Sequence, residues 1–252
     1  MCQQSPGEPI PDSGIPSPAA PASLIDELVV ANQILFRHGV VDAFGHISVR
    51  HPDNPERFLL ARNMAPALVT ADDIVEFNLD GQPVNAGGRP VYLERFIHGE
   101  ILRQRPDVIA VVHSHAPAVV PFGVVRGASL RPIWHMSYFL SEQTPVFEIR
   151  DTAGDGSDML IRSQQLGAAL ANSLADGQVV LMRGHGVTVT GGSIRQAVYN
   201  AVYTQMNAEL QLKASVLGPA QYLSPAEVAA ARVSVGSQVN RAWDLWVREA
   251  TG

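Results

Sequence analysis

Val108-Ile109-Ala110-Val111-Val112-His113-Ser114-His115 is the stretch of this 252-residue sequence that decides the fold. Its five apolar residues, most of them β-branched, predict a buried strand. Side chains two residues apart on a strand share a face, so His113 and His115 project together where the apolar run ends. Two imidazoles in this arrangement suit one divalent metal ion, and a hydrogen-bonded pair at a strand end is the alternative.

The composition limits the class of protein. A net charge of -6 argues against nucleic acid and against an anionic membrane surface as partners. No apolar run is long enough to span a bilayer. The single cysteine, Cys2, excludes an intrachain disulfide and leaves His and carboxylate side chains as metal ligands. The N-terminus has no signal-peptide pattern, which predicts a cytoplasmic protein.

The chain divides into a leader and a domain. Residues 1–22 are rich in Pro, Ser and Gly and predict a flexible leader. Residues 23–252 predict a single domain that ends in helices. Strand patterns occur at 45–50, 58–62, 74–79, 108–112, 146–149 and 179–182. Helix patterns occur at 23–39, 92–103, 163–175, 193–217 and 238–250, with a further helix start at 224. This alternation, without a phosphate loop or dinucleotide fingerprint, predicts a layered α/β fold.

A polar face is predicted on the strand at 45–50. His46, Ser48 and Arg50 lie on one face, and Ile47 and Val49 lie on the other. A base, a hydroxyl and a guanidinium on one face can hold an anionic substrate. The alternative is that this face meets solvent.

Two further segments can complete a metal site. Glu94 lies in the helix predicted over 92–103, four residues before His98 and on the same face. Glu94 can supply a carboxylate ligand, although the pattern alone favours an interaction with the helix dipole. Arg183-Gly184-His185-Gly186 follows an apolar strand, and its glycines allow a tight turn that brings the imidazole close to another group. Three imidazoles with an open position are typical of a catalytic metal site.

These motifs resemble the class II aldolase/adducin family over roughly Ser23 to Gly218. Gly45 to Arg50 is similar to the family's Gly-Asn-hydrophobic-Ser-x-Arg segment. Glu94 to His115 is similar to its block of an acid and two ligands, and 183–186 is similar to its third-ligand block.

The resemblance implies a three-layer α/β/α fold around a largely antiparallel or mixed sheet. It also implies a homotetramer with sites between neighbouring subunits. A divalent metal ion would lie on His113, His115 and His185, with Glu94 as a further ligand or an acid/base. Zinc and manganese fit this donor set best, and iron is compatible.

The departures from the family pattern point to the substrate class. Sugar-phosphate members bind phosphate with the Asn of the first motif, a Thr/Ser-Gly turn and Ser residues before the Glu. Here His46 replaces the Asn, residues 63–67 read Asn-Met-Ala-Pro-Ala, and 91–93 read Val-Tyr-Leu. These differences argue against a sugar-phosphate aldolase or epimerase.

The remaining pattern resembles the decarboxylase branch of the family. Its members act on hydroxylated aromatic or pyridine dicarboxylates, such as the dicarboxylate formed in pyridoxine breakdown and dihydroxyphthalates. A metal chelated by the substrate's hydroxyl and carboxylate would serve as a Lewis acid for the carbanion left by carbon dioxide. A general acid would then protonate the ring.

The resemblance also suggests roles for individual residues. His135 is the expected proton donor, because it lies near the position where family aldolases place a Tyr that reaches the adjacent subunit. His46 and Arg50 are expected to bind a substrate carboxylate. Ser48 and Arg62 are further candidates, and His98 is expected to be structural or to support a ligand.

Three other functions remain open at this point. One is an aldolase that cleaves a non-phosphorylated hydroxy-keto acid, and a more distant one is an iron-dependent oxygenase. An adducin-like scaffold without catalysis is the alternative from another class. The complete set of Glu94, His113, His115 and His185 argues against a scaffold, since a scaffold needs no ligands.

Overall fold

The computed structural model describes residues 20–252, and one mixed sheet of seven strands organises them. The strands are β1 (His46–Arg50), β2 (Arg57–Ala61), β3 (Ile74–Asn78), β4 (Ala110–Ser114), β5 (Val146–Phe147), β6 (Val179–Met182) and β7 (Gly186–Gly191). Their order in the sheet is β3-β2-β1-β4-β7-β6-β5. Neighbours pair antiparallel except β5 and β6, which are parallel. The expected mixed sheet is confirmed.

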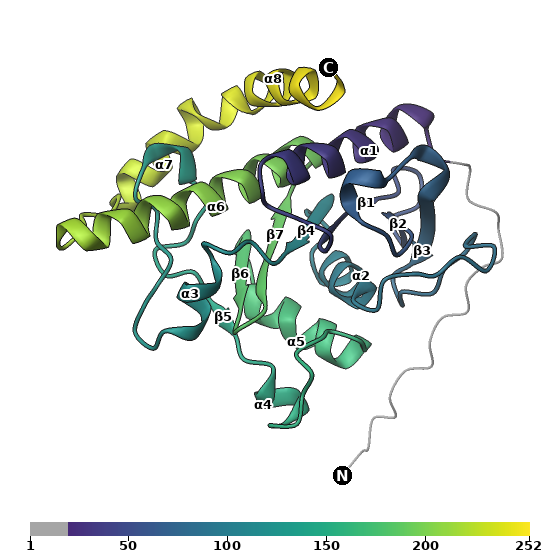
Figure 1. Ribbon diagram of the computed structural model, residues 1–252, viewed down its shortest axis with the longest axis horizontal. Coiled ribbons are helices and arrows are strands. Elements are labelled where there is room, and N and C mark those ends of the chain that lie inside the picture. The colour runs from purple at the N-terminus through teal and green to yellow at the C-terminus, as the bar shows by residue number, and fades with distance from the viewer. Residues whose placement is uncertain (1–19) are drawn as a thin grey trace, which may run out of the picture.

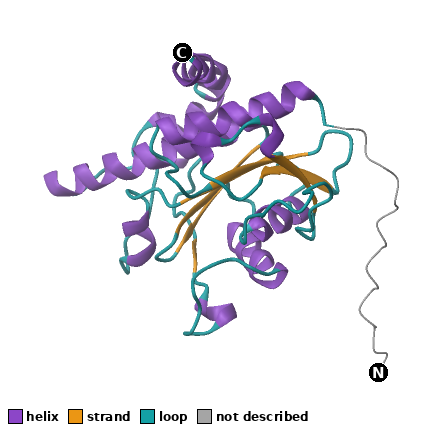
Figure 2. Cartoon of the chain, turned by 45° about the vertical axis from the view of Figure 1, so that its right-hand side comes forward, coloured by secondary structure: helices purple, strands orange, loops and turns teal. Residues whose placement is uncertain are grey.

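Helices cover both faces of this sheet (Figures 1 and 2). The main ones are α1 (Ala22–Arg37), α2 (Arg95–Gln104), α5 (Gln164–Leu174), α6 (Ile194–Leu217), α7 (Pro225–Ser234) and α8 (Val239–Thr251). Helices α1 and α6 lie over one face, with α8 outside them, and α2 and α5 lie together over the other. Shorter turns of helix are α3 (Val120–Val124), α4 (Arg150–Ala153), η1 (Pro66–Leu68), η2 (Ala71–Asp73), η3 (His135–Ser137) and η4 (Gly236–Gln238).

Strand β4 is the central strand, as the opening sequence stretch predicts. Every residue of β4 is buried. It pairs with β1 on one side and β7 on the other, and His113 stands opposite His46 in this pairing. Side chains opposite one another in a pair share a face, so both imidazoles lie on the face that α2 covers.

Some boundaries differ from the predicted ones. Helix α1 begins at Ala22, one residue before Ser23, and no side chain caps it. The predicted leader, 1–22, lies almost wholly outside the described residues, which begin at Ala20. Helix α2 begins at Arg95 rather than at residue 92, because Glu94 is its N-cap residue. Strand β7 was not predicted, although Val187 to Thr190 has the β-branched composition of a strand.

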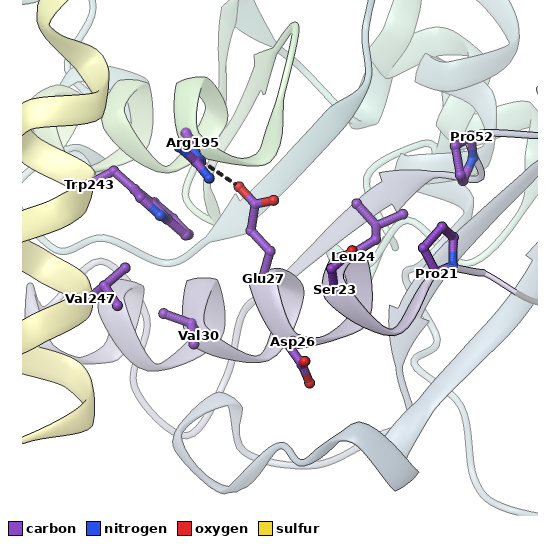
Figure 3. A pocket seen from close by; sticks show the side chains of 10 residues that line it. All are labelled: Pro21, Ser23, Leu24, Asp26, Glu27, Val30, Pro52, Arg195, Trp243 and Val247. Atoms are coloured by element: carbon purple, nitrogen blue, oxygen red, sulfur yellow. Dashed lines mark hydrogen bonds and ion pairs between the residues drawn. The ribbon is translucent and has the colours of Figure 1, made fainter.

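Arg195 contacts two other helices, through an ion pair and a cation–π contact, beside a cavity of about 560 Å³ (Figure 3). Arg195 of α6 donates from Nε to Glu27 of α1 at 2.8 Å. Its guanidinium also lies 5.6 Å from the ring centre of Trp243 in α8. This contact fixes the outer helix against the layer that packs on the sheet.

No helix between Ala20 and Gly252 combines the length and the apolar character that crossing a bilayer requires. The cytoplasmic location stays a prediction.

Candidate metal centre

Four side chains from three segments converge beside the carboxyl end of β4. His113 lies in β4 and His115 directly follows the strand. His185 lies in the turn between β6 and β7, and Glu94 precedes the first turn of α2. One ligand atom of each of these residues lies within 4.8 Å of the others. The segments that the sequence marks as ligand candidates therefore meet at one point.

The spacing of the ligand atoms fits a metal ion. The Nε2 atom of His115 lies 3.2 Å from that of His113 and 3.0 Å from that of His185. Oε2 of Glu94 lies 3.5 Å from Nε2 of both His113 and His185. Tetrahedral ligands at zinc distances stand about 3.4 Å apart. Three imidazole nitrogens and a carboxylate oxygen at these separations form a site that could hold a divalent cation.

The protonation states of His115 and Glu94 also favour binding of a cation. Burial, together with repulsion from His113 and His185, lowers the pKa of His115 to about 4. Burial opposes ionisation of Glu94, but attraction and hydrogen bonds from His113 and His185 outweigh it and hold its pKa well below the usual range. A neutral imidazole and an ionised carboxylate are the forms that bind metal.

A backbone amide holds the second oxygen of Glu94. The N–H of Ile161 donates to Oε1 at 2.9 Å, which leaves Oε2 directed at the histidines. Ile161 lies in the loop before α5. Sequence analysis missed this contact, and no side-chain motif could have shown it, because the donor belongs to the main chain.

Glycine is required on each side of His185, for a different reason at each position. Gly184 has φ +64°, the left-handed conformation that favours glycine in a tight turn. A Cβ on Gly186 would lie 2.1 Å from the carbonyl oxygen of Ser114 and 3.0 Å from Cα of His115. Glycine therefore lets the turn pack directly against the strand end that carries His113 and His115.

A chain of hydrogen bonds lies behind the ligands. His46 is 4 % exposed, and its ring centre lies 5.2 Å from that of His113. Its Nδ1 lies 2.7 Å from Nε2 of His98, and Nδ1 of His98 lies 2.6 Å from Oγ of Ser48. Tyr92, which sequence analysis did not select, packs on His46 with ring centres 4.5 Å apart. His46 and Ser48 thus lie beside the cluster, as His98 does.

Arg50 has a different environment from the one expected. Its guanidinium donates to the carbonyl oxygens of Leu102 and Arg105 at the end of α2, and to those of Pro55 and Val108. These bonds occupy all three of its nitrogens in holding the helix and the adjacent loops. This differs from the expectation that Arg50 binds a substrate carboxylate, because its donors are already used within the protein.

Arg62 directly follows β2 and donates to Asp73 at 2.7 Å. Burial raises the pKa of the Tyr92 hydroxyl, and its hydrogen bond to Met64 and attraction to Arg62 partly offset this effect. A role for Arg62 in substrate binding stays a prediction.

His135 lies apart from the four-residue cluster. It is exposed in η3 and lines a cavity of about 430 Å³ with Tyr199, Tyr203 and Trp246. No contact joins His135 to Glu94, His113, His115 or His185 within the described chain. A role for His135 as proton donor stays a prediction.

Comparison with known proteins identifies the family. The model of the Class II Aldolase and Adducin N-terminal domain matches residues 26–212. The chain belongs to this family. The match includes the full cluster of Glu94, His113, His115 and His185, so the family resemblance found in the sequence is confirmed.

Relatives and solved structures agree with this assignment. Decarboxylase tropJ of Talaromyces stipitatus is 40% identical over 91% of this chain and 95% of its own. A 3,4-dihydroxyphthalate decarboxylase of Arthrobacter keyseri is 35% identical over 81% of this chain and 84% of its own. An L-fuculose 1-phosphate aldolase structure from Glaciozyma antarctica PI12 covers 93% of both chains with a TM-score of 0.74 and 22% identity, which confirms the fold.

Proposed function

We propose that this protein is a metal-dependent decarboxylase of a hydroxylated aromatic or pyridine dicarboxylate. The observation that carries the proposal is the convergence of Glu94, His113, His115 and His185 in a chain whose relatives include decarboxylases. The dihydroxyphthalate decarboxylase among them supports a ring that carries hydroxyl and carboxylate groups. The sequence departures at the phosphate-binding positions support the same class.

His113, His115 and His185 would hold the metal ion, with Glu94 as a fourth ligand or an acid/base beside it. Zinc or manganese suits these donors, and iron is compatible. When bound, the ion would supply Lewis acidity toward an oxygen of the substrate. The position of Oε2, 3.5 Å from Nε2 of both His113 and His185, supports the ligand role.

The reaction breaks the bond between a ring carbon and a carboxylate and releases carbon dioxide. The bonding electron pair stays on the ring carbon, which then takes a proton. We assign this proton to His135 of an adjacent subunit in a homotetramer, since His135 is exposed and lies away from the cluster of its own chain. His46, and more weakly Arg62, would contact the substrate's carboxylate, whereas Ser48 is 0 % exposed and would act only through His98.

Carbon dioxide release from a panel of hydroxylated aromatic and pyridine dicarboxylates tests the proposal. We expect release by the metal-loaded wild type and none by the H113A/H115A double variant. His38→Ala is the matched control, because His38 is the C-cap residue of α1 and belongs to no ligand cluster. If the metal-loaded protein releases none from any compound, the decarboxylase assignment fails for that panel. Cleavage of hydroxy-keto acids is then the next assay.

A further inference from the structure

A buried row of three polar side chains crosses from β1 to α2. Ser48, His98 and His46 are joined by the 2.6 Å and 2.7 Å contacts given above. Ser48 and His98 are both 0 % exposed, so that no solvent reaches the middle of the row. Ring nitrogens can donate or accept, and the direction of each hydrogen bond must therefore be worked out from the partners that are present.

The hydroxyl of Ser48 sets the direction. Nδ1 of His98 is its hydrogen-bond partner, and the described residues offer it no second one. If His98 donated to Ser48, the hydroxyl proton would be left without an acceptor in a fully buried position, which is costly. If Ser48 donates, its proton is satisfied and only oxygen lone pairs remain without a partner. Ser48 is therefore the donor.

The remaining hydrogen bond follows from this direction. Because Nδ1 of His98 accepts, neutral His98 carries its proton on Nε2 and donates it to Nδ1 of His46. His46 then carries its own proton on Nε2. This tautomer of His46 does not depend on the charge of His98, since a protonated His98 ring also donates from Nε2 to His46.

We propose that Ser48 and His98 are positioning residues that fix His46 as the tautomer with its proton on Nε2. His46 thereby presents a neutral hydrogen-bond donor beside the metal centre, and its acceptor is a carboxylate or phenolate oxygen of the bound molecule. The identity of this acceptor rests on the proposed function. The tautomer itself rests only on the three buried side chains.

Solid-state NMR of the zinc-loaded full-length protein, labelled with nitrogen-15 in histidine, tests the tautomer directly. The signals of His46 are identified by their loss in His46→Gln. We expect a protonated Nε2 and an unprotonated, hydrogen-bonded Nδ1 for His46. In Ser48→Ala we expect a mixture of both tautomers, since the group that sets the direction is gone. Protonation of His46 on Nδ1 in the wild type would overturn the proposal, whatever reaction the protein catalyses.

Kinetics of the same variants test the role of His46 in binding. If the two tautomers are about equally populated in Ser48→Ala, half of the molecules lack the oriented donor, and KM rises about twofold with kcat unchanged. Ser137→Ala is the matched control, because the Ser137 hydroxyl is equally buried but has no partner to lose. His98→Gln keeps an N–H donor for His46 and should retain KM, whereas His98→Leu should not.

An unchanged KM in both Ser48→Ala and His98→Leu would overturn the binding role of His46. If no compound is turned over at all, the proposed function fails, but the NMR result still decides the tautomer. The two failures are therefore distinguishable.

Discussion

At the scale of single residues, the charge of the centre depends on Glu94. Three neutral imidazoles, one carboxylate and a divalent cation sum to a charge of about +1. With the cation bound, this net positive charge would attract an anion such as the dicarboxylate of the proposed function. The amide of Ile161 keeps Glu94 in place, so that its second oxygen stays with the histidines.

The buried imidazole of His98 makes stability depend on pH. Burial, with repulsion from His113, lowers the pKa of His98 from 6.5 to about 3. Between these values the unfolded chain binds a proton that the folded chain does not, so acid favours unfolding. We expect the free energy of unfolding to fall as the pH is lowered from 6.5 to about 3.

Chemical denaturation of the chelator-treated wild type and of His98→Gln across this range measures the effect. The variant lacks the titrating ring and should lose less stability on acidification. Parallel curves for the two proteins would show that His98 is not the group responsible.

Arg50 illustrates how one residue can stabilise several segments. Replacement by Met removes donors from the carbonyl oxygens of Leu102, Arg105, Pro55 and Val108. We expect the free energy of unfolding to fall by about 3 kcal/mol, measured by urea denaturation. KM should stay the same in the folded protein.

Arg103→Met is the control for this substitution. Arg103 lies in α2, the helix whose end Arg50 holds, but it is exposed, and its ion pairs with Asp80 and Glu100 should together be worth about 1 kcal/mol. A raised KM with unchanged stability in Arg50→Met would instead return Arg50 to the substrate site.

At the scale of elements, the site depends on how closely the β6–β7 turn approaches β4. Gly186→Ala would place Cβ 2.1 Å from the carbonyl oxygen of Ser114, so the turn must move. We expect His185 to shift away from His115 and metal affinity to fall by about tenfold or more, measured by zinc titration. Gly192→Ala is the control, because a Cβ there meets nothing within 4 Å. Equal zinc affinity in the two variants would contradict this account.

The sequence predicts those elements whose residues carry a recognisable pattern over a few neighbouring positions. The apolar run before His113 and the two-residue spacing to His115 are enough to predict a strand with paired imidazoles. The contacts of Arg50 were not predictable, because they depend on which helix covers β1. The amide of Ile161 and the tautomer of His46 depend on pairings of residues 50 or more positions apart.

At the scale of the whole molecule, His135 and the metal cluster lie in separate places on one chain. If each active site combines Glu94 of one subunit with His135 of the next, two inactive variants can complement each other. We expect His135→Gln and Glu94→Gln to be nearly inactive alone. Co-expressed hybrids should recover about a quarter of wild-type activity, which is the chance that both intact residues meet at one interface. Hybrids without activity would place the proton donor elsewhere.

The two outermost strands limit how copies of this chain can associate. Strand β5 has only two residues and directly follows Pro145, and Phe77 of β3 already forms a bridge with Pro83. Short outer strands and prolines leave few free backbone groups for another sheet to pair with. The sheet is therefore protected from growing into a continuous intermolecular sheet and from the aggregation that this causes. Among the described residues, side chains on the helices and loops offer the more open surface for contacts between copies.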